Sequence, residues 1–219
     1  MHVILTTSDQ SSLIMNKRLL WNFEINDSNP LQMPTPRGLE QEDIRWEARF
    51  FWPENTVITL HGLNDKYLDI SRYEIKHRDD IYCVLPDANY NLKIRREQLL
   101  YKPLLATTPY AQGYGKKIKL DEQTRTSSLP GLNDITPSML WQHSQNTRHK
   151  IHVEKEALIY PFETSPKCTL ELAKLHVKNA TYFSVNIESR SLMLVTSLAK
   201  QIIGLDATCD YITFLKGHA

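Results

Sequence analysis

Features that would identify a protein class at once are scarce in this chain of 219 residues. It has only three cysteines, Cys83, Cys168 and Cys209, which are far apart and lack metal-binding spacing. Its formal net charge of +1 gives no overall attraction to nucleic acid or to an acidic membrane surface. No apolar run is long enough to span a membrane, and residues 1–10 lack a basic region followed by an apolar one. These absences predict a cytoplasmic protein with buried free thiols and no membrane partner.

Several catalytic and ligand-binding motifs are missing as well. Gly113-Tyr114-Gly115 lacks the further glycines and the lysine of a phosphate-binding loop. No Gly-x-Ser-x-Gly motif occurs, and no cysteine has a histidine partner that the sequence reveals. The histidines show no metal-ligand spacing, so we expect His152 to be a polar wall residue rather than a ligand.

What the sequence does contain is an alternation of charged and aromatic residues between Arg45 and Trp52. Side chains of a β-strand alternate between its faces, so Arg45, Glu47 and Arg49 share one face and the aromatic residues share the other. The simplest interpretation is a half-buried strand with its charges in water. Charged residues spaced two apart recur, however, at 91–95, 117–119 and 148–156. This repetition favours a barrel whose charged faces converge on an interior channel.

The remaining pattern predicts seven or eight strands and few helices. Helices are expected at 136–145, which starts with Thr-Pro, and at 191–203, which Gly204 would end. We also expect a helix from 11 to about 21, and a long strand from 148 to 160 that ends at Pro161. Together these elements predict a mainly β (α+β) fold, an antiparallel β-barrel of about eight strands with a few flanking helices.

Proline marks the expected N-terminal boundary. Asn29-Pro30, Met33-Pro34 and Thr35-Pro36 follow one another closely, which is typical of a loop. We therefore interpret residues 1–40 as an N-terminal extension, packed or partly mobile. The barrel domain is expected to occupy residues 41–219.

A series of short motifs follows one another in a recognisable order. Arg45, Glu47 and Arg49 stand at the positions of a strand with the pattern Glu-x-Glu-x-Lys. Asp80-Ile81-Tyr82, Leu92-Lys93-Ile94-Arg95, Lys102 and Val185-Asn186-Ile187-Glu188 then match an Asp-x-Tyr strand, a Leu-Arg-Ile-Arg strand, a lysine ending the next strand and a late Glu-x-Glu strand. In this order, residues 45 to 215 resemble the CYTH superfamily, the triphosphate tunnel enzymes that include thiamine triphosphatases, class IV adenylate cyclases and RNA triphosphatases.

The resemblance implies a tunnel that holds a triphosphate with fixed cations and a divalent metal. Arginine and lysine bind phosphate through charge-assisted hydrogen bonds. The expected substrate-binding residues are Arg45, Arg49, Lys93, Arg95, Lys102, Lys117, Lys119, Arg148 and Lys150. Glutamates beside phosphate suit a metal that prefers oxygen ligands. We therefore expect Glu47, Glu171 and Glu188 to bind Mg²⁺ or Mn²⁺, with Glu47 and Glu188 as the catalytic pair.

Two departures from the family pattern leave the function open. Arg45 and Asn186 stand where the family has glutamates, so each paired-carboxylate motif keeps one carboxylate. We favour metal-dependent hydrolysis of a triphosphate or related phosphoanhydride inside a basic tunnel. The alternative is a catalytically degenerate anion- or nucleotide-binding module on the same barrel. Cyclisation of ATP is a weaker third option, because no base-recognition site is apparent.

Each hypothesis implies a small-molecule polyphosphate or a nucleoside triphosphate as the partner. Nucleic acid is expected only as a 5′-triphosphate end, because aromatic residues are not interleaved with basic runs. A homodimer is compatible with the sequence.

Overall fold

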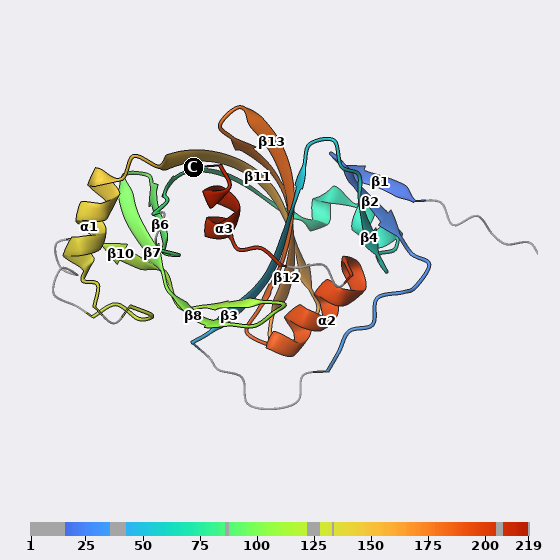
Figure 1. Ribbon diagram of the computed structural model, residues 1–219. Helices are drawn as coiled ribbons and strands as arrows, with labels where there is room; N and C mark the ends of the chain where they lie inside the picture. Colours follow the sequence, from blue (N-terminus) through green and yellow to red (C-terminus); the bar gives the residue numbers. More distant parts are fainter. Residues whose placement is uncertain are drawn as a thin grey trace, which may run out of the picture.

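The protein is mainly β, and its centre is one large antiparallel sheet (Figure 1). The computed structural model describes residues 16–35, 43–85, 88–121, 128–132, 134–204 and 208–218. Within them, ten strands form the sheet in the order β10-β7-β6-β5-β11-β12-β13-β3-β9-β8. Their bounds are β3 Arg45–Pro53, β5 Glu74–Cys83, β6 Asn91–Arg95, β7 Gln98–Lys102, β8 Leu104–Thr107, β9 Gln112–Tyr114, β10 Ile118–Leu120, β11 Lys150–Phe162, β12 Cys168–Val177 and β13 Ala180–Ser189. The prediction of a mainly β chain is confirmed.

The longest strand, β11, lies in the middle of the sheet. It pairs with β5 from Lys150 to Ile159 and with β12 from Val153 to Phe162. The strand was expected to end at Pro161, but it continues to Phe162. At Pro161 it pairs with β12 alone, so it is an edge there, and an edge tolerates a residue without an N–H group.

One face of the sheet is apolar and is covered by helix α2 (Leu192–Ile202). Phe50 of β3, Leu158 of β11 and Leu170 of β12 are buried in this cluster with Leu194 and Leu198 of the helix. The helix begins where Ser191 Oγ accepts a hydrogen bond from the Leu194 N–H. It ends before Gly204, whose φ of +105° suits glycine. The predicted helix at 191–203 is confirmed.

A smaller three-stranded sheet extends this apolar cluster. It contains β1 (Lys17–Leu20), β2 (Phe23–Asn26) and β4 (Ile58–His61) in the order β1-β2-β4. The helix predicted for 11–21 is therefore wrong over 17–20, and residues 11–15 lie outside the described residues. Phe23 and Ile25 are fully buried against the large sheet. Residues 16–35 thus share the core, as a packed extension would.

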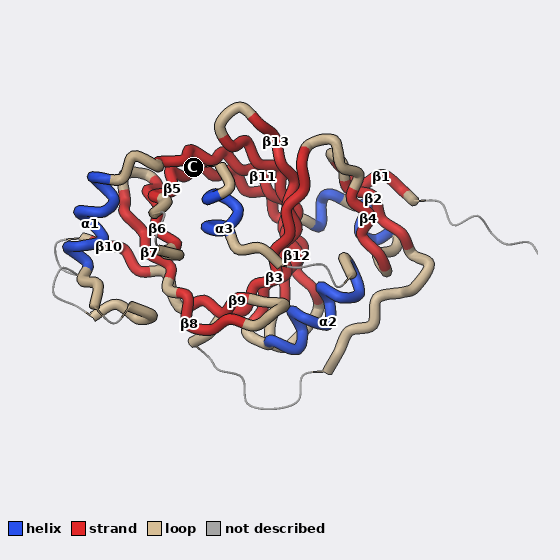
Figure 2. The backbone as a smooth tube through the Cα atoms, in the orientation of Figure 1, coloured by secondary structure: helices blue, strands red, loops and turns tan. Residues whose placement is uncertain are grey.

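Two other helices cover the opposite face and one end of the sheet. Helix α3 (Tyr211–Lys216) lies inside the curve of the strands, where Tyr211, Ile212 and Leu215 join a second buried cluster (Figure 2). Helix α1 (Pro137–Asn146) packs Leu140 on a third cluster beside β6 and β7. Its start was predicted correctly, since Thr136 Oγ1 accepts from the Met139 N–H and Pro137 follows. No helix within the described part of the chain is long and apolar enough to cross a membrane.

The two ends of the pairing order are adjacent along the chain. Strand β7 leads to β8 through Pro103 alone, and β9 leads to β10 through residues 115–117. The Gly115 N–H donates to the Pro103 carbonyl over 2.9 Å, between these two connections. The pairing order itself is linear, with β10 and β8 at its ends. This order does not by itself close the sheet, so the predicted barrel stays a prediction.

Candidate functional site, a charged face on the inner side of the sheet

Charged side chains gather on the face of the sheet that α2 leaves uncovered. Directly opposite residues of an antiparallel pair lie on the same side of a sheet. The register places Glu47 opposite Glu188, Glu171 opposite Asn186, and Lys155 opposite Arg78. We call this side the charged face. Its basic members are Arg45, Arg49, Lys76, Arg78, Lys93, Arg95, Lys102, Lys117, Lys119 and Lys155, and its acidic members are Glu47, Glu74, Asp80, Glu171 and Glu188.

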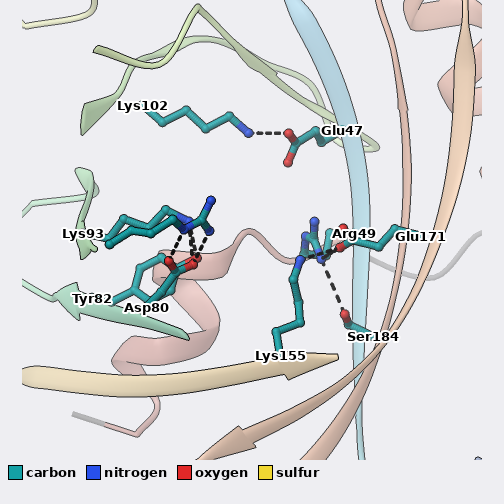
Figure 3. Close-up of polar contacts among 10 residues, drawn as sticks. Glu47, Arg49, Asp80, Tyr82, Lys93, Lys102, Lys155, Glu171 and Ser184 are labelled. Atoms are coloured by element: carbon teal, nitrogen blue, oxygen red, sulfur yellow. Dashed lines mark hydrogen bonds and ion pairs between the residues drawn. The ribbon is translucent and has the colours of Figure 1, made fainter. Parts of the chain in front are cut away.

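The first group on the charged face is a buried triad of Arg49, Glu171 and Lys155 (Figure 3). Glu171 Oε1 accepts from Arg49 Nη1 over 3.1 Å and from Lys155 Nζ over 2.9 Å. Burial, and secondarily Arg49, lower the pKa of Lys155 to about 8, although Glu171 opposes them. Burial would raise the pKa of Glu171, but Lys155 and Arg49 hold it well below its usual range. The triad is ionised and its members are held by one another.

Asn186 and Ser184 complete the surroundings of this triad on β13. In the amide orientation that satisfies both of its ends, Asn186 donates to the Ala48 carbonyl over 3.2 Å and accepts from Arg49 over 3.1 Å. Arg49 Nη1 also donates to Ser184 Oγ over 3.4 Å. Asn186, which stands where the family pattern has a glutamate, therefore helps to position the Arg49 guanidinium.

Tyr211 connects the triad to helix α3. The Arg49 guanidinium lies 4.9 Å from the centre of the Tyr211 ring, and Tyr82 stacks on that ring at 5.1 Å. Phe214 stacks on Phe51 at 4.0 Å. These contacts fill one end of the charged face with aromatic side chains.

The second group surrounds Asp80 of β5. Asp80 Oδ2 accepts from Lys93 Nζ over 2.8 Å, and Arg95 binds both oxygens of the same carboxylate. Lys93 Nζ also lies 3.2 Å from the Tyr82 hydroxyl. Burial, and Arg95 beside it, lower the pKa of Lys93 to about 7, with Asp80 opposing. One carboxylate is thus the ion-pair partner of two cations, of which Arg95 is partly exposed.

Further basic side chains converge near this group. Burial lowers the pKa of Lys117, and so does repulsion from Arg95, Lys102 and Arg78. The register of β10 against β7 places Lys119 opposite Leu100, which faces Lys93. Positive charge therefore accumulates along β5, β6 and β10.

The third group joins β3 to β7 and β13. Lys102 donates to Glu47, and Arg45 Nη1 donates to Glu188 Oε1 over 2.9 Å. Because burial disfavours its charge and Glu47 lies beside it, the pKa of Glu188 is raised. Burial acts in the same direction on Glu47, but Lys102 and Arg49 outweigh it and lower its pKa. The pair of carboxylates is therefore adjacent, and each member has its own cation.

The fit of these residues to a divalent metal is poor as they are arranged. Carboxylate oxygens are the right donors for Mg²⁺ or Mn²⁺. Glu47 is bound by Lys102, Glu188 by Arg45, and Glu171 by both Arg49 and Lys155. The part of the chain that the structure describes contains no group of three or more His, Cys, Asp or Glu that could hold a metal ion. The predicted Mg²⁺ or Mn²⁺ stays a prediction.

Most of the predicted site residues lie on the charged face. Those brought together are Arg45, Glu47, Arg49, Lys93, Arg95, Lys102, Lys117, Lys119, Glu171 and Glu188. Lys150 is a correction, because it lies opposite Cys83, whose side chain belongs to the cluster under α1. Lys150 and Lys155 are five positions apart on one strand, an odd spacing, so they point to opposite faces. Arg148 is exposed in the bend that precedes β11 and is not brought to the charged face either.

Sequence reasoning missed Lys155, Arg78 and Tyr211. A signal for Lys155 existed, because it interrupts the apolar alternation of Ile151, Val153 and Ala157. A charged residue in the buried phase of a strand must find a partner. No comparable signal marks Tyr211, whose role depends on where α3 packs.

Comparison with protein-family models finds no match to this chain, and comparison with curated protein sequences finds none either. The resemblance to the CYTH superfamily therefore depends on the order of the motifs, and membership of that superfamily stays a prediction.

Proposed function

We propose that the charged face binds a small ligand with several phosphate groups, of the triphosphate or polyphosphate class, inside a tunnel formed by the sheet. The observation that carries this proposal is the surplus of cations on the charged face. Arg78, Lys117 and Lys119 have no hydrogen-bond or ion-pair partner among the described residues. Cations brought together repel one another, and a bound polyanion reverses that cost.

The strand connections support closure of the sheet into a tunnel. Residues 98–107 form one nearly continuous arm through β7 and β8, and residues 112–120 form another through β9 and β10. The two arms pair with each other twice, through β7 with β10 and through β8 with β9. The Gly115–Pro103 hydrogen bond lies between these two pairings. One arm pairs with β6 and the other with β3, so the ends of the linear order meet through this hairpin.

The chemistry of the cations supports phosphate as the ligand. Arginine forks hold two phosphate oxygens at once, and lysine ammonium groups act as point charges. The side chain of Arg95 is partly exposed while bound to Asp80, and Lys117 is exposed. These groups can exchange water for phosphate without breaking the buried triad around Glu171.

Calorimetry with inorganic tripolyphosphate in the absence of metal tests the proposal. Replacing Lys117 and Lys119 by Gln should weaken binding by about tenfold or more, since hydrogen bonds to charged groups contribute roughly 1.5–3 kcal/mol each. Lys150→Gln is the matched control and should bind as the wild type does. Equal losses of affinity in the Lys117/Lys119 variant and in Lys150→Gln, or no binding by the wild type, would contradict a phosphate site on the charged face.

Metal-dependent hydrolysis is the second candidate, and the adjacency of Glu47 and Glu188 favours it. Release of orthophosphate from tripolyphosphate, measured with Mg²⁺, Mn²⁺ or a chelator, separates the two candidates. Release that requires a metal and disappears in Glu188→Gln would favour the hydrolase. Binding without release under every condition would favour a non-catalytic module.

A further inference from the structure

Strand β5 has a partner along one side only for most of its length. It pairs with β11 from Glu74 to Cys83, but with β6 only at Ile81 and Tyr82. Strand β6 ends at Arg95, and the chain turns into β7 through two residues with positive φ, 48° at Arg96 and 62° at Glu97. Such a turn reverses the chain tightly. Residues 74–79 therefore have no strand partner on the β6 side among the described residues.

This edge is open to solvent. None of the residues from 74 to 79 is buried, and Ile75 exposes 52% of its surface. In an antiparallel pair, alternate residues direct their N–H and C=O groups away from the paired neighbour. These groups along 74–79 can accept a further strand, which would continue the line of β6 beyond Arg95.

A cavity of about 970 Å³ borders the same segment. Residues 75–79, Arg95 and Arg96 line it together with side chains of β11 and β12. Its lining contains six Lys or Arg residues against three Asp or Glu residues. Side chains of an added strand would therefore meet a recess with a surplus of positive charge.

The charges along β5 decide between two occupants of this edge. In a symmetric pair of two copies, the register centred on Ile75 pairs only residues 74–76 within this segment, and every register centred on residues 76 to 79 places like charges directly opposite one another. Like charges in that position destabilise a sheet. A strand with acidic side chains on the same face meets Arg78 with opposite charge instead, and it also faces Lys76, which forms an ion pair with Glu74 over 2.9 Å.

We propose that residues 74–79 are a docking edge for an extended acidic peptide, which adds to the sheet as a strand in line with β6. Backbone hydrogen bonds supply the pairing, and the alternate acidic side chains face Lys76 and Arg78. The exposed Ile75 offers an apolar contact to the other side of the peptide. The proposal shares Arg78 with the polyphosphate site, but the strand pairing uses the backbone groups of residues 74–79, which that site does not need.

The first test uses a short, blocked, fluorescein-labelled peptide of alternating Glu and Val and measures anisotropy with the wild-type protein. Two further peptides carry N-methyl groups on either the Glu or the Val residues. Strand addition uses the N–H groups of one alternate set only, so one N-methylated peptide should lose about tenfold or more in affinity and the other should not. A Lys-Val peptide should not bind.

The second test locates the contact on the protein. Amides within 74–79 should exchange more slowly with solvent when the peptide is bound. Arg78→Glu should weaken binding by about tenfold, whereas Arg190→Glu, an exposed residue after β13 with the same change of charge, should not. The proposal is overturned if the wild type does not bind, if both N-methylated peptides bind alike, or if protection appears away from 74–79.

Discussion

The two groups around Glu171 and Asp80 have the same ratio of charges and different surroundings. Each consists of two basic side chains on one carboxylate. Around Glu171 the surplus charge is surrounded by Asn186, Ser184 and the Tyr211 ring. Around Asp80 it is increased by Lys117, which Arg95 repels. The first arrangement suits a group that holds the fold together, and the second suits a group that holds a ligand.

The largest effect is expected for Glu171→Gln, which tests whether the group around Glu171 holds the fold together. Removing this carboxylate leaves Arg49 and Lys155 buried without a counter-charge, so the free energy of unfolding should fall by about 3–5 kcal/mol. Urea denaturation measures this change. Glu188→Gln is the control and should cost far less, because burial and Glu47 already disfavour the charge of Glu188. Similar losses in the two variants would mean that the triad is not structural.

Asp80→Asn should give a smaller loss, about 1–3 kcal/mol, because Arg95 is partly exposed and keeps water as a partner. Added tripolyphosphate should then raise the melting temperature of Asp80→Asn more than that of Glu171→Gln. Thermal unfolding with and without the ligand measures this rescue. Equal rescue in both variants would remove the distinction between a ligand-binding and a structural group.

The pH dependence of stability should sharpen the comparison further. With a folded pKa of about 7 against an ordinary value of 10.5, Lys93 is deprotonated in the fold but protonated in the unfolded chain between these values. The free energy of unfolding should therefore rise with pH above about 7, by at most about 1.4 kcal/mol per unit from this residue. Lys93→Met should reduce that slope, and Lys150→Met should leave it unchanged. An unaltered slope in Lys93→Met would show that Lys93 keeps its proton.

The smallest effect expected is a gain in stability. Lys117→Met removes one cation from a place where Arg95, Lys102 and Arg78 repel it. Since single surface charges contribute little, the free energy of unfolding should rise by about 0.5 kcal/mol or less. Sulfate should stabilise the wild type more than this variant. A loss of stability in Lys117→Met would indicate that Lys117 has a favourable partner in the ligand-free protein.

Local patterns were the part of the fold that the sequence predicted well. The strand at 45–52 and the helices at 136–145 and 191–203 follow from side-chain alternation and from capping residues, which act within a few positions. Residues 17–20 were misread as helix, because β1 pairs with β2, and β2 is held by β4 and by the burial of Phe23 against distant strands. Tertiary packing overrode the helical spacing there.

The sequence could predict which site residues share a face within one strand, because side chains alternate along a strand. Arg45, Glu47 and Arg49 were assigned to one face correctly because they belong to one strand. Lys150 was assigned to the wrong face because its charge was given more weight than the alternation of Ile151, Val153 and Ala157, which puts Lys150 on the opposite side of β11. The partners of each charge, such as Arg45 for Glu188, come from strands far apart in sequence.

The register of β11 also limits how this chain can change its length. With β5 on one side and β12 on the other, inserting one residue between Val153 and Lys155 would send Lys155 to the face of Glu154 and Glu156 and Leu158 toward the charged face. Substitutions can be absorbed one at a time, whereas a single insertion or deletion would exchange both faces at once. Insertions and deletions should therefore be tolerated only in turns such as Lys178-Asn179, where the alternation of side chains between the two faces does not have to be maintained.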